Sequence, residues 1–376
     1  MNKYFKTLNI NGLGPLTQED FIELNKICSK VLSNKSSSKK NRCFICKKQN
    51  KPYCNSHTIP QFILKNIAKN GELLTTQIFN KTPFSKPISG LNNTQTFHKI
   101  CTDCDKKTFK DYENPDAYDK IPSQNILKQI ALKSYISRSY KHQKELKLGY
   151  YAKNNIQQNA DYLRLVQLEY ELNVCNYNYQ SKNKKANFVL KNINNDEVLF
   201  KIQYFKTLDY VVPYALQSHF IILFDFNDEP LANTFDISDI NAKDDIILCI
   251  FPLKTKSIII AFDYLGNSLY DNFFTTLNTL TLDEQLSIIN YLVFLYCEDI
   301  YFNNNIDDKI KKDENLIKFA NSQQKVGAKS FDVLFLSEKK YEEERLKEIL
   351  NSHNINNYKT IPNLLGKKYA INARCL

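Results

Sequence analysis

Two CxxC pairs constrain the fold of this chain of 376 residues more than any other feature. Cys43 and Cys46 form the first pair and Cys101 and Cys104 the second, whereas the other six of the ten cysteines stand singly. Zinc prefers four soft ligands in a tetrahedron, and cysteines spaced in this way are a common means of supplying them. We therefore predict one structural Zn²⁺ ion held by these four thiolates. The alternatives are four buried, reduced cysteines without metal and, less favoured, a ligand set that includes Cys54.

The composition describes a globular chain with room for two domains. Hydrophobic residues make up 43% and charged residues 24%, which excludes a disordered or fibrous chain. Domains hold roughly 150 residues each. With only 8 glycines and neither a P-loop nor a dinucleotide-binding glycine motif, nothing supports a nucleotide motor or a dinucleotide enzyme.

The N-terminal sequence and the hydropathy indicate where the protein works. The opening residues, MNKYFKTLNINGLG, lack the apolar stretch of a secretion signal, and no uncharged apolar run of about 18 residues occurs. We therefore expect a cytoplasmic protein without a membrane segment. In that compartment cysteines bind metal or pack in the core more often than they form disulfides.

Positive charge is concentrated in the first part of the chain. Residues 1–160 carry a net charge of +16 and residues 161–376 a net charge of −5, which together give the +11 of the whole chain. The cations around the first CxxC pair are Lys35, Lys39, Lys40, Arg42, Lys47, Lys48 and Lys51. Such a cluster attracts phosphate backbones by counterion release, so nucleic acid is the expected partner. A solvated, flexible linker is the alternative, because the tract SNKSSSKKN is polar throughout.

The segment between the two pairs carries the motif SHTIP, and an aspartate follows the last cysteine directly. Here the chain resembles the HNH, or His-Me finger, nucleases, in which a CxxC pair precedes a hairpin with a histidine followed by Ile and Pro, an asparagine lies in a loop, and a second CxxC pair opens a helix. The matching residues are Cys43, Cys46, His57, Ile59, Pro60, one of Asn92 and Asn93, Cys101, Cys104 and Asp105. The match covers residues 43–113, less than a quarter of the chain. It implies a zinc-stabilised ββα-metal domain, similar to a treble clef, that hydrolyses phosphodiester bonds in DNA.

The resemblance implies roles for individual side chains. His57 would be the general base that deprotonates water, since imidazole has its ordinary pKa near working pH. The alternatives for His57 are a buried histidine that holds the loop by hydrogen bonds and a zinc ligand. Asp105 would bind a catalytic divalent ion, Mg²⁺ or another, and Asn93 would be the loop asparagine. The chain departs from the family at Ser56, where an acid or histidine that binds the metal is usual, and at Asp105, where the family has His or Asn.

Two more side chains are candidates for contact with the ion or the phosphate. Glu113 lies about two helical turns beyond Asp105, and His98 lies three residues before Cys101. For Glu113 a solvated or salt-bridged surface acid is the alternative, and for His98 a structural role. In the second half of the chain, Glu298 and Asp299 follow an apolar run and are the candidate functional acids there. The alternative is that they are solvated acids at the end of a helix.

Other functions are compatible with the same residues. A non-catalytic zinc module that binds nucleic acid is the main alternative to an endonuclease, and a purely structural interaction protein is the third. Because one finger cuts one strand per event, cleavage of both strands predicts a homodimer or repeated nicking. The rest of the chain would select the target or respond to an activating partner or ligand, as in bacterial defence against foreign DNA.

The residue patterns predict an α+β protein in four segments. These are an N-terminal helix and basic linker (1–42), the zinc-bound nuclease-like domain (43–120), a helical connector (121–185) and a larger mixed α/β domain (186–376). Helices are expected at 16–33, 123–146, 161–174 and, from a capping box at Thr281 and Glu284, at 281–302. Strands are expected on both sides of a turn at 194–196 and at 219–226, 245–252 and 256–264, before a final strand and helix within 330–350.

Overall fold

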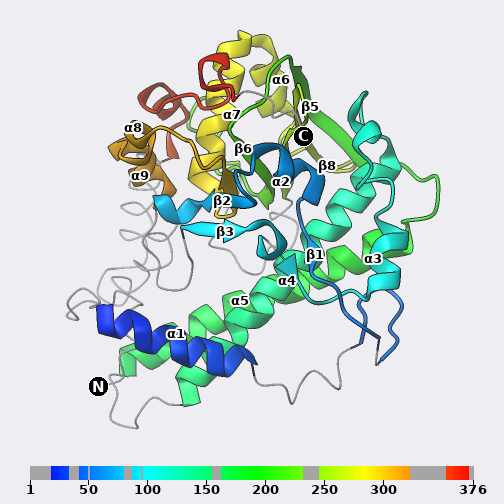
Figure 1. Ribbon diagram of the computed structural model, residues 1–376, viewed down its shortest axis with the longest axis vertical. Helices are drawn as coiled ribbons and strands as arrows, with labels where there is room; N and C mark the ends of the chain where they lie inside the picture. The colour runs from blue at the N-terminus through cyan, green and yellow to red at the C-terminus, as the bar shows by residue number, and fades with distance from the viewer. Residues whose placement is uncertain are drawn as a thin grey trace.

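The fold is a seven-stranded antiparallel sheet with helices on both faces (Figure 1). A computed structural model describes residues 18–33, 42–49, 51–79, 87–94, 96–154, 162–231, 245–321 and 353–371. Its mixture of helices and antiparallel strands confirms the α+β class. The basic tract at 34–41 and the strand and helix expected within 330–350 lie outside the described residues.

The large sheet has the strand order β3-β2-β9-β6-β7-β8-β5, and all neighbouring strands are antiparallel. Its strands are β2 (Glu72–Thr75), β3 (Ile88–Gly90), β5 (Phe200–Leu208), β6 (Tyr214–Phe220), β7 (Ile246–Pro252), β8 (Ser257–Tyr264) and β9 (Ile300–Phe302). β7 is buried along its whole length and β8 along nearly all of it. Both strands therefore read as continuous apolar runs, since a sheet covered on both faces needs no polar side.

Alternate residues of β7 enter two separate cores. Leu248 and Ile250 pack on one face, where the helices are α6 (Asp271–Thr279), α7 (Leu282–Tyr296), α8 (Asp308–Lys311) and α9 (Glu314–Ala320). Cys249 and Phe251 point to the other face, which packs against α2 (Gln61–Ile67), α4 (Gln124–Asn154) and the end of α5 (Tyr162–Lys191). This alternation follows from the two-residue period of a strand. Short 3₁₀ helices lie at Thr76–Ile78, Leu91–Asn93, Pro115–Tyr118, Ile355–Thr360 and Lys367–Tyr369.

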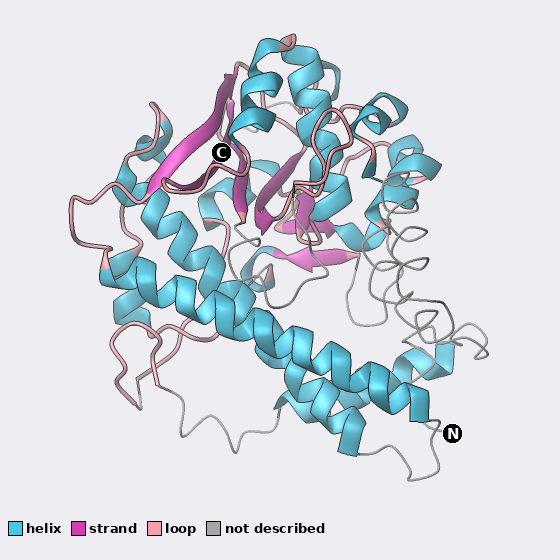
Figure 2. Cartoon of the chain, turned by 180° about the vertical axis from the view of Figure 1, so that it is seen from behind, coloured by secondary structure: helices cyan, strands magenta, loops and turns pink. Residues whose placement is uncertain are grey.

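The two longest helices, α4 and α5, pack side by side and extend well beyond the sheet (Figure 2). Their distal part has a small core of its own, formed by Leu146, Ala152, Leu168 and Leu172. The helices approach closely at Gly149, where an added Cβ would lie 2.6 Å from Leu172. The N-terminal helix α1 (Gln18–Ser33) packs against α4. None of the helices among the described residues combines the length and the apolar character needed to cross a membrane.

The expected boundary at residue 120 does not separate two sheets. β2 and β3 lie within the segment 43–120, yet β2 pairs with β9 and so joins the sheet of the C-terminal segment. Only β1 (Ser56–His57) and β4 (Thr96–Phe97) form a separate two-stranded sheet. The proposed nuclease-like segment and the larger segment therefore share one hydrogen-bonded framework.

Several expected elements need correction. The turn at 194–196 does not join two strands, because α5 continues to Lys191 and buries Ala186 and Val189 near its end, while Ile193 is buried in the turn that follows. The strand expected at 219–226 is β6 and ends at Phe220. The helix expected over 281–302 ends at Tyr296 and is followed by β9. Its predicted capping box is present.

Candidate functional site

Four cysteines from distant parts of the chain meet in one cluster. Cys43 and Cys46 lie in a tight turn, and Cys101 and Cys104 open helix α3 (Thr102–Thr108). The four sulfur atoms all lie within 4.8 Å of one another, and the Sγ atoms of Cys46 and Cys101 are 3.9 Å apart. The Cys101 backbone N–H donates to Cys43 Sγ at 3.3 Å. These residues could hold a single tetrahedral metal ion such as zinc, as the spacing predicts.

Local hydrogen bonds shape the turn that carries the first pair. Cys43 N–H donates to the Lys48 carbonyl at 3.0 Å and Lys47 N–H to the Cys43 carbonyl at 2.9 Å, with Lys47 at a φ of 58°. A hydrogen bond from the Lys48 backbone is the main cause that lowers the pKa of Cys46 to about 7, whereas burial raises the pKa of Cys104. A cation is needed for all four thiols to ionise together.

Cys54 lies outside this cluster. Its Sγ contacts the Ile100 carbonyl at 3.6 Å, and burial raises the pKa of its thiol to about 12. A protonated thiol that donates to the backbone is an ordinary structural cysteine. The less favoured ligand set that includes Cys54 is therefore not the one that the fold assembles.

The SHTIP motif begins on a short antiparallel ribbon beside the cysteines. In this ribbon Ser56 of β1 faces Phe97 of β4, and His57 faces Thr96. Helix α3 begins at Thr102, shortly after β4, so the chain follows the strand, strand, helix order expected for a ββα finger. The segment between the two strands of the ribbon is long and includes α2, β2 and β3.

A backbone carbonyl orients the imidazole of His57. Its Nε2 lies 3.0 Å from the carbonyl oxygen of Leu91, in the turn Leu91–Asn93. A carbonyl only accepts hydrogen bonds, so Nε2 carries the proton of the neutral ring and Nδ1 keeps a lone pair. In the same turn Asn92 accepts a hydrogen bond from Gln61 at 3.1 Å, and Asn93 is exposed.

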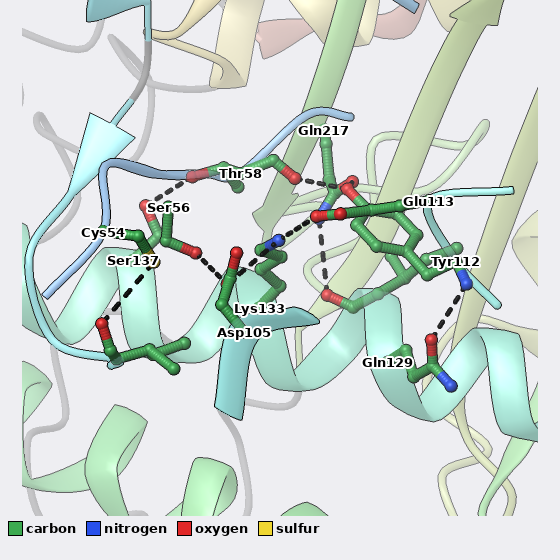
Figure 3. Close-up of polar contacts among 12 residues, drawn as sticks. Cys54, Ser56, Thr58, Asp105, Tyr112, Glu113, Gln129, Lys133, Ser137 and Gln217 are labelled. Carbon is green, nitrogen blue, oxygen red and sulfur yellow. Dashed lines mark hydrogen bonds and ion pairs between the residues drawn. The ribbon is translucent and has the colours of Figure 1, made fainter. Parts of the chain in front are cut away.

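The carboxylate of Asp105 faces the other residue of β1. Ser56 Oγ donates to Asp105 Oδ1 at 2.5 Å (Figure 3). The ammonium group of Lys133, on α4, lies 3.4 Å from Asp105 Oδ1 and 2.5 Å from Glu113 Oε1. The Lys133 side chain is 0% exposed and its Nζ sits 4.4 Å from the centre of the Phe109 ring. One buried cation thus joins both predicted acids.

Lys133 and its surroundings were not among the expected site residues. In the network of Figure 3, the Tyr112 hydroxyl contacts the Thr58 carbonyl and donates to Gln217 Oε1 at 2.6 Å. Gln217 Nε2 in turn donates to Ser134 Oγ at 2.9 Å. These bonds connect Thr58, the middle residue of the SHTIP motif, to strand β6. The sequence did contain a signal for the burial of Lys133. This lysine lies among the apolar residues that form the buried side of α4.

The predicted metal ligands do not all converge. Across the described part of the chain, three or more ligand atoms gather within 4.8 Å in two groups, and His57, His98, Asp105 and Glu113 belong to neither. His98 is an exposed residue that stands outside both groups. We therefore assign His98 no contact with the site.

Comparison with protein-family models, with curated proteins and with solved structures finds no match for this chain. The likeness to HNH nucleases therefore rests on the motif residues. What the site can do has to be argued from its own chemistry.

Proposed function

We propose that the zinc module is the catalytic finger of an HNH-type endonuclease that hydrolyses phosphodiester bonds in DNA. One observation carries the proposal: on strand β1 a backbone carbonyl orients the imidazole of His57, and the preceding residue, Ser56, contacts the carboxylate of Asp105. A candidate base and a candidate ion ligand are thus held by adjacent residues of one strand. Hydrolysis of a phosphodiester needs both groups in fixed positions.

His57 would act as the general base. The Leu91 carbonyl holds the proton on Nε2, so the lone pair of Nδ1 is the one that can take a proton from water. The resulting hydroxide would attack phosphorus as the bond to the 3′ oxygen breaks. The departing oxygen would take a proton from solvent, and the imidazolium would release its proton to solvent. The cysteine cluster would contribute rigidity, since its metal would fix the turn at Cys43 against the start of α3.

Asp105 is the described carboxylate that best suits a divalent ion at this finger. Mg²⁺ keeps several waters and needs only one or two carboxylates, so Asp105 with the neighbouring Ser56 hydroxyl meets a minimal requirement. Glu113 contributes less, because its carboxylate lies closer to Lys133, at 2.5 Å, than the carboxylate of Asp105 does, at 3.4 Å. When bound, the ion would stabilise the negative charge that develops on the phosphate oxygens. Lys133 is a second source of positive charge at the same place.

Positive charge and an adjacent cavity support an anionic substrate. A cavity of about 210 Å³ is lined by Leu91, whose carbonyl orients His57, and by the lysines Lys65 and Lys254. Arg42 and Lys48 are exposed beside the cysteine cluster. A DNA strand crossing this surface would meet cations close to the proposed base. Selection of target, dimerisation and activation by a partner or ligand would then belong to the larger segment, in keeping with a role in defence against foreign DNA.

Conversion of supercoiled plasmid to nicked and linear forms tests the proposal. The natural protein, His57→Ala and the control His98→Ala are each incubated with Mg²⁺ or with EDTA. We expect cutting that needs Mg²⁺, disappears in His57→Ala and persists in His98→Ala, with zinc content unchanged. Equal cutting by the natural protein and His57→Ala would refute the role of His57. Cutting that persists in EDTA would show that no divalent ion is needed, and Lys133 would then be the group that stabilises negative charge on the phosphate.

A non-catalytic zinc module that binds nucleic acid is the second candidate. The observation that favours it is the pairing of Asp105 and Glu113 with Lys133, which balances one of their two negative charges without a metal. Binding without cutting would survive His57→Ala and fall steeply with salt, because phosphate contacts release counterions. Titration of labelled DNA at several salt concentrations, run beside the plasmid assay, separates the two functions.

A further inference from the structure

A second cluster of ligating side chains lies between helices α4 and α5, away from the cysteine cluster. His142 and Glu145 stand three residues apart on α4, and Cys175 faces them from α5. His142 Nδ1 lies 2.8 Å from Glu145 Oε2, and Cys175 Sγ lies 3.7 Å from the same oxygen. One ligand atom from each of the three residues lies within 4.8 Å of the others.

The separations suit a tetrahedral zinc ion. Zinc bonds of about 2.0 to 2.3 Å at tetrahedral angles place neighbouring ligand atoms about 3.3 to 3.7 Å apart. The contact between Cys175 and Glu145 already has this length, and the contact between His142 and Glu145 must open by about 0.5 Å. A set of imidazole, carboxylate and thiolate selects a borderline ion such as Zn²⁺ over Mg²⁺ or Ca²⁺.

The positive side chains near this cluster are paired with other acids and do not exclude a bound cation. Three cationic side chains act on this cluster, Arg138, Lys141 and Lys182. Arg138 and Lys141 contact the carboxylate of Glu298, and Lys182 lies 2.5 Å from that of Asp245. The carboxylate and a thiolate would carry two negative charges, which a divalent ion would balance.

An ion bound at this cluster would link helix α4 to helix α5. Beyond the sheet, α4 and α5 are held together by a core of four buried side chains, and Cys175 packs against that core. We infer that His142, Glu145 and Cys175 form a second zinc site that clamps α4 to α5, with water as the fourth ligand on the exposed side of Glu145. On binding, Cys175 loses its thiol proton to solvent, and the imidazole proton of His142 moves from Nδ1 to Nε2, so one proton is released per ion.

Zinc counting on the full chain tests this site. The protein is equilibrated with excess Zn²⁺, freed of unbound metal by gel filtration and analysed for zinc per chain. We expect two ions in the natural protein and one in Glu145→Gln, a change that keeps the shape of a half-exposed side chain and its bond to His142 but removes the charged ligand. Cys175→Ser should also retain one. The matched variant Cys46→Ser should lose the ion of the cysteine cluster and keep the ion between α4 and α5.

Cobalt supplies an independent measure that does not depend on counting. Co²⁺ bound to four thiolates gives far stronger sulfur-to-metal absorption than Co²⁺ bound to one. The Cys46→Ser protein should therefore show only a weak band, and adding Glu145→Gln should abolish it. One zinc ion in the natural protein with an unchanged number in Glu145→Gln would overturn the inference, as would a cobalt spectrum of Cys46→Ser that Glu145→Gln leaves intact.

Discussion

Ser56 Oγ donates a hydrogen bond of 2.5 Å to Asp105 Oδ1 and so ties strand β1 to the first turn of helix α3. In the nucleases that the finger resembles, these two positions are places for metal ligands. Here a hydroxyl replaces one ligand and a carboxylate the other. In the proposed mechanism Asp105 is therefore the main ligand of the divalent ion, and Ser56 positions it.

Asp105→Asn should reduce DNA cutting by about 100-fold or more, because it removes the only ionised ligand proposed at the finger while keeping the side-chain shape. Ser56→Ala should reduce cutting by less than about 10-fold, since it removes one hydrogen bond worth about 1 kcal/mol. Initial rates of plasmid nicking at saturating Mg²⁺ measure both. Equal losses in the two variants would contradict the separate roles.

The cysteine cluster should be required for folding of the finger. Cys46→Ser should remove the metal of that cluster and lower the free energy of unfolding by more than about 3 kcal/mol, because zinc binding adds directly to folding energy. Cys54→Ser is the matched control, since Cys54 lies outside the cluster and a serine can keep its bond to the Ile100 carbonyl. Zinc content and urea unfolding distinguish the two. Loss of zinc in Cys54→Ser would show that the ligand set differs.

Lys133→Met should destabilise the protein by about 3 kcal/mol, because it leaves the carboxylate of Asp105 beside a buried site without its cation. Urea unfolding at neutral pH measures this loss. Lys51→Ala removes a cation from an exposed pair with Asp103 and should have no measurable effect. If Mg²⁺ replaces the charge of Lys133, added Mg²⁺ should restore part of the stability of Lys133→Met. An equal effect of Mg²⁺ on the natural protein would argue against this replacement.

Glu298 should make part of the stability depend on pH. The ammonium group of Lys141 and the guanidinium of Arg138 outweigh the cost of burial and hold the pKa of Glu298 well below its usual range. A carboxyl whose pKa is lower in the folded than in the unfolded protein stabilises fully above about pH 4 and loses this contribution as the pH falls below that value. Glu298→Gln should therefore be less stable than the natural protein at pH 7, and the difference between the two should be much smaller near pH 2. Urea unfolding at both values tests this, and an equal deficit at both would contradict it.

Patterns between close neighbours in the chain were readable without the structure. The spacing within each CxxC pair predicted the two halves of the cysteine cluster, and Thr281 with Glu284 predicted the start of α7, because each of these patterns lies within one turn of the chain. The apolar runs of β7 and β8 were found for the same reason. The β-branched and aromatic residues before residue 194 misled, because burial of one face of α5 outweighed their preference for strands.

The sequence by itself determined which short segments form helices and strands, which cysteines pair at ligand spacing and where the basic charge gathers. Only the tertiary structure decided that β2 joins the sheet of the C-terminal segment, that Lys133 reaches Asp105, and that Cys175 faces His142. Local periodicity reports which face of an element is apolar but not which partner covers it. Those partners are set by packing between elements far apart in the chain, which no short stretch of sequence encodes.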